Sequence, residues 1–220
     1  MKRRFPSLVL ILVLVWMWAP TVLAQDAPTG PRLTILLSND DGYDALGLKA
    51  LAEALAPMTQ LTVATPTVEQ SGAGHGITYR EPIMVNRIDR DGGIPWYSIT
   101  ARPATCVRLA LEALMTTKPD LVISGINRGE NLGVVTFASG TVGAAREAAF
   151  DGLPAMAVSL GGNNSDDYQA AAAYVRRLVE QLQTQKLLRS GLFLNVNVPA
   201  GVARGIKGVR LTKLSLKVPG

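Results

Sequence analysis

The sequence predicts an α/β fold with a doubly wound, mostly parallel sheet and an inserted β-hairpin. Short apolar runs alternate along the chain with segments whose apolar residues recur at helical spacing. The runs are unbroken, as expected for strands that lie between two layers of helices. The chain has 220 residues, 48% of them apolar, which suits one domain with a substantial core.

The first half of the chain contains the clearest strand and helix patterns. Continuous apolar runs predict strands at residues 33–38 and 61–65. Between them, leucines and alanines at helical spacing predict a helix over residues 46–55. Residues 77–99 alternate more weakly and contain the turn sequence Asp91-Gly92-Gly93, which predicts a hairpin inserted beside the main sheet.

The second half continues the alternation of helices and strands. Expected here, in chain order, are a helix at 104–115, a strand at 121–123, a helix at 142–150, a strand at 155–159, a helix at 166–188 and a strand at 192–198. Ser165 and the two aspartates after it are a favourable start for the long helix. In such a sheet ligands bind beyond the carboxyl ends of the strands, so polar residues that follow strands are the candidates for a functional site.

Residues 1–24 have the features of a signal peptide. Three basic residues at positions 2–4 precede a short apolar run at 8–18, Pro20 interrupts it, and Val22-Leu23-Ala24 offers small residues for cleavage. The run is shorter than the roughly 20 residues of a membrane-spanning helix. We therefore expect cleavage after Ala24 and export to the periplasm, rather than a retained anchor or a stable membrane span.

The leader also accounts for most of the positive charge. Residues 1–24 hold three of the 22 basic residues and none of the 17 acidic ones, so without them the formal charge falls from +5 to +2. No Lys/Arg run remains of the kind that binds nucleic acid polymers, and we expect no such partner. Residues 25–32 contain two prolines and a glycine, which predicts a lead-in without regular structure.

Two adjacent carboxylates, Asp40 and Asp41, follow the first predicted strand in the sequence Ser38-Asn39-Asp40-Asp41-Gly42. Asn, Asp and Gly commonly form turns, so a plain turn is one interpretation. The other is a divalent-metal site, because adjacent carboxylates repel each other unless a cation lies between them. One Cys and one His are too few for a structural zinc site, so any metal is expected to bind through oxygen, as Mg²⁺ or Mn²⁺ does.

Three further polar segments are expected at the same edge of the sheet. They are the glycine-rich run with Ser71 and His75, the amides Asn127 and Asn131, and the sequence Ser139-Gly140-Thr141. The glycines permit close approach to a ligand but equally suit a mobile loop, and the asparagines could serve only in caps or turns. The third segment precedes a helix, where free backbone N–H groups bind phosphate or where Ser is simply the N-cap.

Taken in order, these motifs resemble the SurE family of metal-dependent 5′/3′-nucleotidases. The resemblance runs from about Leu33 to about Lys213. The segments that carry it are Ile35 to Gly42, Ser71 to Thr78, Pro119 to Gly133, Ser139 to Val142 and Asn195 to Pro199.

The resemblance implies a Rossmann-like domain over residues 33–220 that hydrolyses nucleoside 5′- or 3′-monophosphates, as a phosphoric monoester hydrolase of the 5′-nucleotidase or acid-phosphatase type. It implies one Mg²⁺ or Mn²⁺ per subunit, held by Asp40, Asp41, Ser71 and Asn127, and a homodimer or higher oligomer. The residues expected to bind the substrate phosphate are Asn39, His75, Asn131, Ser139, Gly140 and Thr141. Asp40 and Asp41 are the expected catalytic residues, with Asp40 taking the proton of the attacking water and His75 a candidate acid.

Two departures from the family pattern keep other hypotheses open. The family's Gly-Thr-Pro-x-Asp-Cys block is here Ala101-Arg102-Pro103-Ala104-Thr105-Cys106, and the chain ends at Gly220, where the family usually continues. The domain is thus expected to be either a short member or C-terminally truncated. A periplasmic homologue that binds nucleotide or phosphate without hydrolysing it is the alternative, and a serine hydrolase that uses His75 is a third hypothesis. Cys106 lies among apolar residues of a predicted helix and is expected to be a buried, inert thiol.

Overall fold

The computed structural model describes residues 32–90 and 92–216. Within them, seven strands form one sheet in the order β3-β4-β2-β1-β5-β6-β7, and every pair is parallel except β3 with β4. The strands are β1 (Leu33–Ser38), β2 (Thr59–Pro66), β3 (Val85–Arg87), β4 (Trp96–Ile99), β5 (Leu121–Arg128), β6 (Ala155–Leu160) and β7 (Phe193–Val198). The predicted signal peptide lies outside the described residues, as does the predicted lead-in apart from Arg32.

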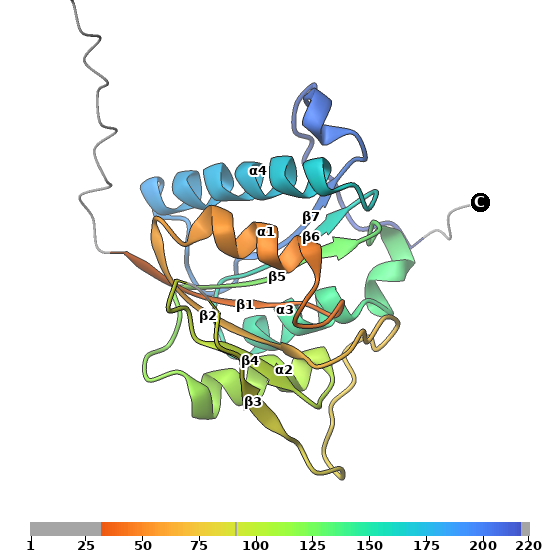
Figure 1. Ribbon diagram of the computed structural model, residues 1–220. Helices are drawn as coiled ribbons and strands as arrows, with labels where there is room; N and C mark the ends of the chain where they lie inside the picture. The colour runs from red at the N-terminus through yellow and green to blue at the C-terminus, as the bar shows by residue number, and fades with distance from the viewer. Residues whose placement is uncertain (1–31, 91, 217–220) are drawn as a thin grey trace, which may run out of the picture.

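Helices cover both faces of the sheet (Figure 1). On one face α1 (Leu46–Leu55) packs against α4 (Ser165–Thr184), and on the other α2 (Pro103–Leu109) packs against α3 (Gly140–Phe150). Short helical segments complete the fold: η1 (Ala110–Leu114), η2 (Gly133–Phe137) and η3 (Val202–Arg204). Along β1, Ile35 and Leu37 join the core under α1 and α4, while Leu36 joins the core under α2 and α3. This burial of both faces explains the unbroken apolar runs in the sequence.

The order of the strands reverses direction between β1 and β5. From β1 the chain passes to β2 and β4 on one side, and it returns with β5 on the other side of β1. The connections that leave β1 and β5 therefore diverge, and a crevice forms beyond the carboxyl ends of these two strands. Asp40 follows β1 and Asn127 lies near the end of β5, so the fold brings both predicted ligand positions to this crevice.

Three elements differ most from their predicted bounds, and β2, α3, β6 and β7 differ by one or two residues at an end. The strand expected at 121–123 continues to Arg128 as β5, and the helix expected at 104–115 is divided into α2 and the π-helical η1. The helix expected to reach residue 188 ends at Thr184, because Lys186 adopts a φ of 55° and the N–H of Leu187 bonds to the carbonyl of Leu182 at 2.9 Å. This C-terminal motif usually carries glycine, so no glycine in the sequence marked the end.

The hairpin expected within residues 77–99 is present as the antiparallel pair of β3 and β4. Its second strand also pairs in parallel with β2, from Val63 opposite Trp96 to Pro66 opposite Ile99. The hairpin is therefore the edge of the main sheet rather than a separate ribbon beside it.

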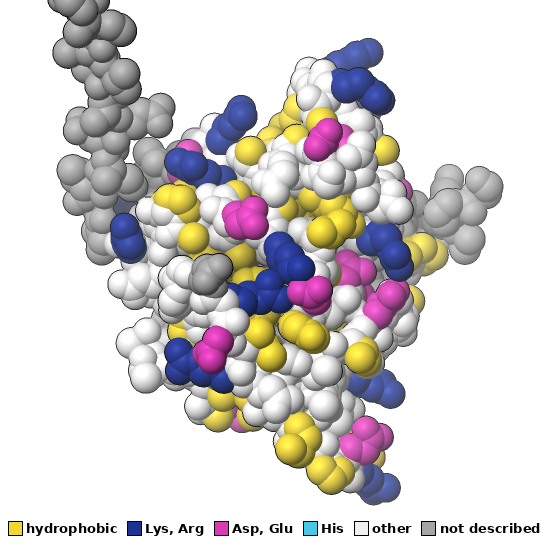
Figure 2. Space-filling model, in the orientation of Figure 1, with side chains coloured by type: hydrophobic (Ala, Val, Ile, Leu, Met, Phe, Trp, Pro, Cys, Tyr) yellow, Lys and Arg dark blue, Asp and Glu magenta, His cyan; other side chains and the backbone are white. Residues whose placement is uncertain are grey.

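The distribution of charged side chains and the hydropathy of the helices concern two kinds of partner, nucleic acids and membranes. Figure 2 shows basic and acidic side chains interspersed over one face of the molecule, with no continuous basic surface on that face. In the part of the chain that the structure describes, no helix combines the length and apolar character needed to cross a bilayer.

Gly143 of α3 is a position where the packing requires glycine. A Cβ there would lie 2.0 Å from the carbonyl oxygen of Gly74, because the glycine-rich loop rests directly on the helix. We expect Gly143→Ala to lower the free energy of unfolding by about 2 kcal/mol. The free-energy cost of the clash exceeds the roughly 1 kcal/mol by which alanine favours a helix over glycine. Urea unfolding measures the change. Gly162→Ala, whose Cβ would lie 3.5 Å from that of Ala200, is the control, and equal stability of the two variants would contradict the packing described.

Candidate metal and phosphate site

The carboxylate of Asp40 is held between the end of β1 and the first turn of α3. Asp40 is only 3% exposed. The hydroxyl of Thr141 donates a hydrogen bond to Oδ1, and a Cβ on Gly140 would lie 2.8 Å from Oδ2. Burial raises the pKa of Asp40, although the hydrogen bonds from Thr141 oppose this rise. The positive end of the helix thus faces a buried carboxylate.

The carboxylate of Asp41 faces the end of β5. Its Oδ2 accepts a hydrogen bond from the backbone N–H of Arg128 at 3.1 Å. Burial, and secondly the charge of Asp40, raise the pKa of Asp41 to about 6. Two neighbouring carboxylates in a partly desolvated place are costly when both are ionised, and a cation between them would remove that cost.

Asn127 reaches the site because β5 is irregular. The register of β5 against β6 shifts between Ser124 and Asn127, and Gly125 in the shift has a φ of 139°. A Cβ on Gly125 would lie 2.3 Å from the carbonyl oxygen of Val158, so glycine is required there. The amide nitrogen of Asn127 donates to the carbonyl of Gly129 at 2.7 Å, which orients the side chain and leaves its oxygen for a ligand.

Ser71 is linked to the same end of β5 through Glu69. The loop is tied to β1 by the N–H of Gln70, which donates to the carbonyl of Asp40 at 2.7 Å. The Ser71 hydroxyl donates to Oε1 of Glu69 at 2.7 Å, and Arg128 pairs with the same oxygen at 3.3 Å. The structure therefore brings Asp40, Asp41 and Asn127 to one crevice and Ser71 to its rim. Glu69 was not predicted, because nothing in the sequence distinguishes it from other loop carboxylates.

The residues in the crevice fit a hard divalent cation. Across residues 32–90 and 92–216, no three His, Cys, Asp or Glu side chains cluster as metal ligands. The donors would be the two carboxylates with the neutral oxygens of Ser71 and Asn127, a set that suits Mg²⁺ or Mn²⁺ better than zinc. Beside them, Oδ1 of Asn39 is buried and has no hydrogen-bond partner among the described residues. A buried polar atom usually has such a partner, so this oxygen is open to a ligand.

The start of α3 provides groups that can bind an anion. Ser139 is the N-cap, and its hydroxyl accepts a hydrogen bond from the N–H of Val142 at 3.1 Å. Gly140 and Thr141 form the first turn, at the positive end of an eleven-residue helix. Ser139 therefore has the capping role that the sequence suggested, and the same turn lies against the carboxylate of Asp40.

Three predicted substrate-binding side chains have their contacts inside the protein. Asn39 is fully buried, and its amide nitrogen donates to the carbonyl of Gly42 at 2.8 Å to close the turn after β1. Asn131 donates to the hydroxyl of Ser159 at 2.8 Å. The third is His75, whose Nε2 lies 2.6 Å from Oε2 of Glu147.

The backbone of Asn131 is held by two asparagines of β7. The side-chain oxygen of Asn197 accepts from its N–H at 2.8 Å, and the side-chain nitrogen of Asn195 donates to its carbonyl at 2.8 Å. These contacts explain the Asn-x-Asn sequence in β7, and they fix the segment that follows β5.

His75 belongs to a cluster on the α2–α3 face of the molecule. Glu147 is almost fully buried and bridges His75 to Arg108, whose Nε lies 2.6 Å from Oε1. The imidazole also stacks on Phe150, with ring centroids 5.2 Å apart. Glu147 thus fastens the glycine-rich loop to α3. Among the described residues, no serine hydroxyl bonds to His75, so the serine-hydrolase hypothesis gains no support.

The block that departs from the family pattern spans the residues before α2 and the first turn of this helix. Thr105 accepts a hydrogen bond from the N–H of Thr78 at 2.8 Å, and the N–H of Arg102 donates to the hydroxyl of Thr78 at 3.0 Å. Cys106 is fully buried, and burial raises its pKa, so the expectation of an inert thiol is confirmed.

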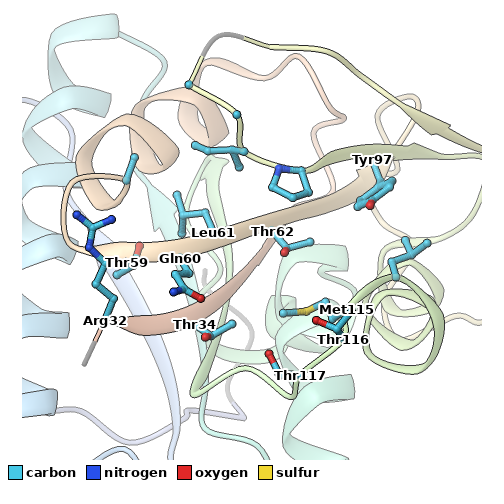
Figure 3. A pocket seen from close by; sticks show the side chains of 16 residues that line it. Arg32, Thr34, Thr59, Gln60, Leu61, Thr62, Tyr97, Met115, Thr116 and Thr117 are labelled. Carbon is cyan, nitrogen blue, oxygen red and sulfur yellow. The ribbon is translucent and has the colours of Figure 1, made fainter. Parts of the chain in front are cut away.

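A cavity of about 560 Å³ lies at the opposite edge of the sheet (Figure 3). Thr34 and Thr62 project into it from β1 and β2, and Thr116 lies across from them (Figure 3). None of the described residues that line it is Asp, Glu, His or Cys, so it offers neither metal ligands nor a general base. A smaller cavity of about 270 Å³ is lined by Asp41 and Arg128, beside the carboxylate pair.

The family model described as Survival protein SurE matches residues 35–219. The chain belongs to the SurE family. Among solved structures, the SurE protein from Aquifex aeolicus is similar to this chain with a TM-score of 0.73 and 37% sequence identity, over 83% of this chain and 72% of that one. This match confirms the Rossmann-like α/β fold that was expected from the sequence.

Curated relatives of this SurE-family chain agree with that assignment. The 5′-nucleotidase SurE of Syntrophobacter fumaroxidans is 42% identical over 181 residues, which cover 82% of this chain and 72% of the relative. Those of Natranaerobius thermophilus and Symbiobacterium thermophilum are 43% and 44% identical over 187 residues, covering 82% and 84% of this chain and 72% and 73% of the relatives.

Replacing Asp41 by Asn should stabilise the metal-free protein at neutral pH. Folding raises the pKa of Asp41 from 3.8 to about 6, so between these values the folded state binds a proton that the unfolded chain has released. The free energy of unfolding therefore falls as pH rises through this window. Above the window, the folded protein carries the full free-energy cost of an ionised Asp41. Since Asp41 is partly exposed, we expect Asp41→Asn to gain about 1 kcal/mol at pH 7.5, or roughly 2–4 °C in Tm.

Thermal unfolding with EDTA measures this gain, which should disappear near pH 4. The exposed Asp89→Asn, which removes the same charge from the loop after β3, is the control and should leave Tm unchanged. Added Mg²⁺ or Mn²⁺ should raise the Tm of the wild type more than that of Asp41→Asn. Equal effects on both proteins would contradict a cation site at Asp41.

Proposed function

We propose that this protein is a metal-dependent phosphomonoesterase that hydrolyses nucleoside 5′- or 3′-monophosphates to nucleoside and phosphate. The observation that carries the proposal is the pair of carboxylates, Asp40 and Asp41, at the crevice between β1 and β5, with the first turn of α3 against Asp40 and the end of β5 against Asp41. The name 5′-nucleotidase carried by the relatives supports the choice of nucleotides as substrates.

We assign the cation to four side chains. Asp40, Asp41, Ser71 and Asn127 would hold one Mg²⁺ or Mn²⁺. A divalent cation bound there polarises the phosphoryl group and acidifies a nearby water molecule. The two carboxylates would offset the double positive charge of such a cation, so the positive end of α3 would supply further attraction for the dianionic substrate.

The protein's own groups orient the phosphate and move the proton. The Ser139 hydroxyl and the backbone N–H of Gly140 bind the equatorial oxygens as negative charge develops on them, and Thr141 at the same turn orients Asp40 through its hydrogen bonds. Asp40 takes the proton of the attacking water. Asn39 acts through the turn that it closes after β1, Asn131 through its hydrogen bond to Ser159 of β6, and His75 through the loop that it fastens to α3.

We further propose cleavage after Ala24, export to the periplasm and association into a homodimer. The charge and hydropathy of residues 1–24 support export. The last described segment carries exposed apolar side chains, among them Leu211 at 94% and Leu216 at 73% exposure, which suit contact with a second copy.

Release of inorganic phosphate from a panel of nucleoside monophosphates tests the function. With Mg²⁺ or Mn²⁺ we expect turnover, and EDTA should abolish it. Asp41→Asn should lower kcat/KM by at least about 100-fold, because the groups that neutralise transition-state charge each contribute on this scale. Asp89→Asn should retain full activity. Absence of phosphate release with every nucleotide and both metals, or full activity of Asp41→Asn, would overturn the proposal.

A second function, nucleotide binding without hydrolysis, is favoured by the exposed Arg102 in a block where the family has threonine. Calorimetry with AMP and Mg²⁺ separates the two functions. Tight binding with no product after several hours would favour the binding protein, whereas release of phosphate would exclude it.

A further inference from the structure

The cavity beside Asp41 lies on the opposite side of the carboxylate pair from α3. It has a volume of about 270 Å³, and its walls come from the turn after β1, from α1, from the end of β5 and from the start of α4. A phosphate held between the first turn of α3 and a cation on Asp40 and Asp41 would lie next to this cavity, because Asp41 lines it. The cavity is therefore placed to receive the leaving group of a phosphate ester.

Tyr168 forms the inner wall of this cavity from the first turn of α4. Its ring packs on Gly47 of α1, where a Cβ would lie 2.8 Å from Cε1, and the residue is 5% exposed. Burial raises the pKa of Tyr168 and the charge of Asp41 adds to this, so the hydroxyl lies within electrostatic reach of that carboxylate. Within residues 32–90 and 92–216 the structure shows no hydrogen bond from this hydroxyl, and a largely buried tyrosine usually has one.

The other walls combine polar and apolar groups. Glu69 and Arg128 pair at 3.3 Å on one side, and the side chain of Asn163 and the half-exposed Leu46 complete the other. Carboxylate, amide and phenol groups can bond to several hydroxyls of one ligand, while leucine packs on a carbon ring. The volume is below the roughly 300 Å³ of pockets that enclose a whole drug-sized ligand, so it suits a sugar rather than a sugar and base together.

We propose that this cavity binds the ribose of the substrate and that the Tyr168 hydroxyl donates a hydrogen bond to a ribose oxygen. The inference rests on the proposed function for the orientation of the phosphate. Tyr168 is thereby a substrate-binding residue that distinguishes sugar phosphates from simple phosphate esters, and it takes no part in the chemical step.

Steady-state kinetics of Tyr168→Phe with AMP, ribose 5-phosphate and methyl phosphate test the assignment. Loss of one hydrogen bond should raise KM about 5-fold for AMP and for ribose 5-phosphate, with kcat unchanged and with no effect on methyl phosphate. Tyr174→Phe, on the same helix but outside the cavity, should change none of these values. Equal changes for all three substrates, or a change for AMP alone, would overturn the ribose assignment.

A binding measurement separates this inference from the proposed function. Calorimetry with adenosine and inorganic phosphate needs no turnover, and Tyr168→Phe should weaken adenosine binding about 5-fold even if the protein hydrolyses nothing. If Tyr168→Phe does not fold, Asn163→Ala, at an exposed residue of the same cavity, should weaken adenosine binding in the same way. Unchanged adenosine binding in the folded variant, or no adenosine binding by the wild type, would overturn the inference.

Discussion

The contact between Asp40 and the first turn of α3 determines how the site is built. The carboxylate is buried at the end of the central strand, Thr141 donates to it, and the missing Cβ of Gly140 lets the helix approach it closely. The glycine-rich loop is in turn tied to Asp40 through Gln70 and to α3 through Glu147. Strand, helix and loop therefore meet at one residue, and the first turn of α3 has a defined position relative to its carboxylate.

This arrangement has an electrostatic cost at neutral pH that a bound cation would remove. Burial, and secondly the charge of the neighbouring Asp40, raise the pKa of Asp41 to about 6. A protein selected for stability alone would avoid such a pair, so the pair is better explained by function than by folding.

The sequence contained the fold and the edge of the sheet that carries the site, but not every contact. Strand β1 and helix α1 have the predicted bounds, because an unbroken apolar run and helical spacing are strong local signals. The continuation of β5 through Asn127 was missed, since polar residues after a glycine resemble a loop. The end of α4 was missed because Lys186 takes a conformation usually marked by glycine. Tyr168 and the partner of His75 depend on packing between helices far apart in the chain, which local patterns do not report.

The most direct test of this account is the anomalous scattering of Mn²⁺ in crystals of the protein. We predict one strong anomalous peak in the crevice between β1 and β5, within bonding distance of carboxylate oxygens of Asp40 and Asp41 and of the amide oxygen of Asn127. A crystal saturated with Mn²⁺ that shows no peak in this crevice, or a peak only at other residues, would contradict the central claim that the buried carboxylate pair is a cation site.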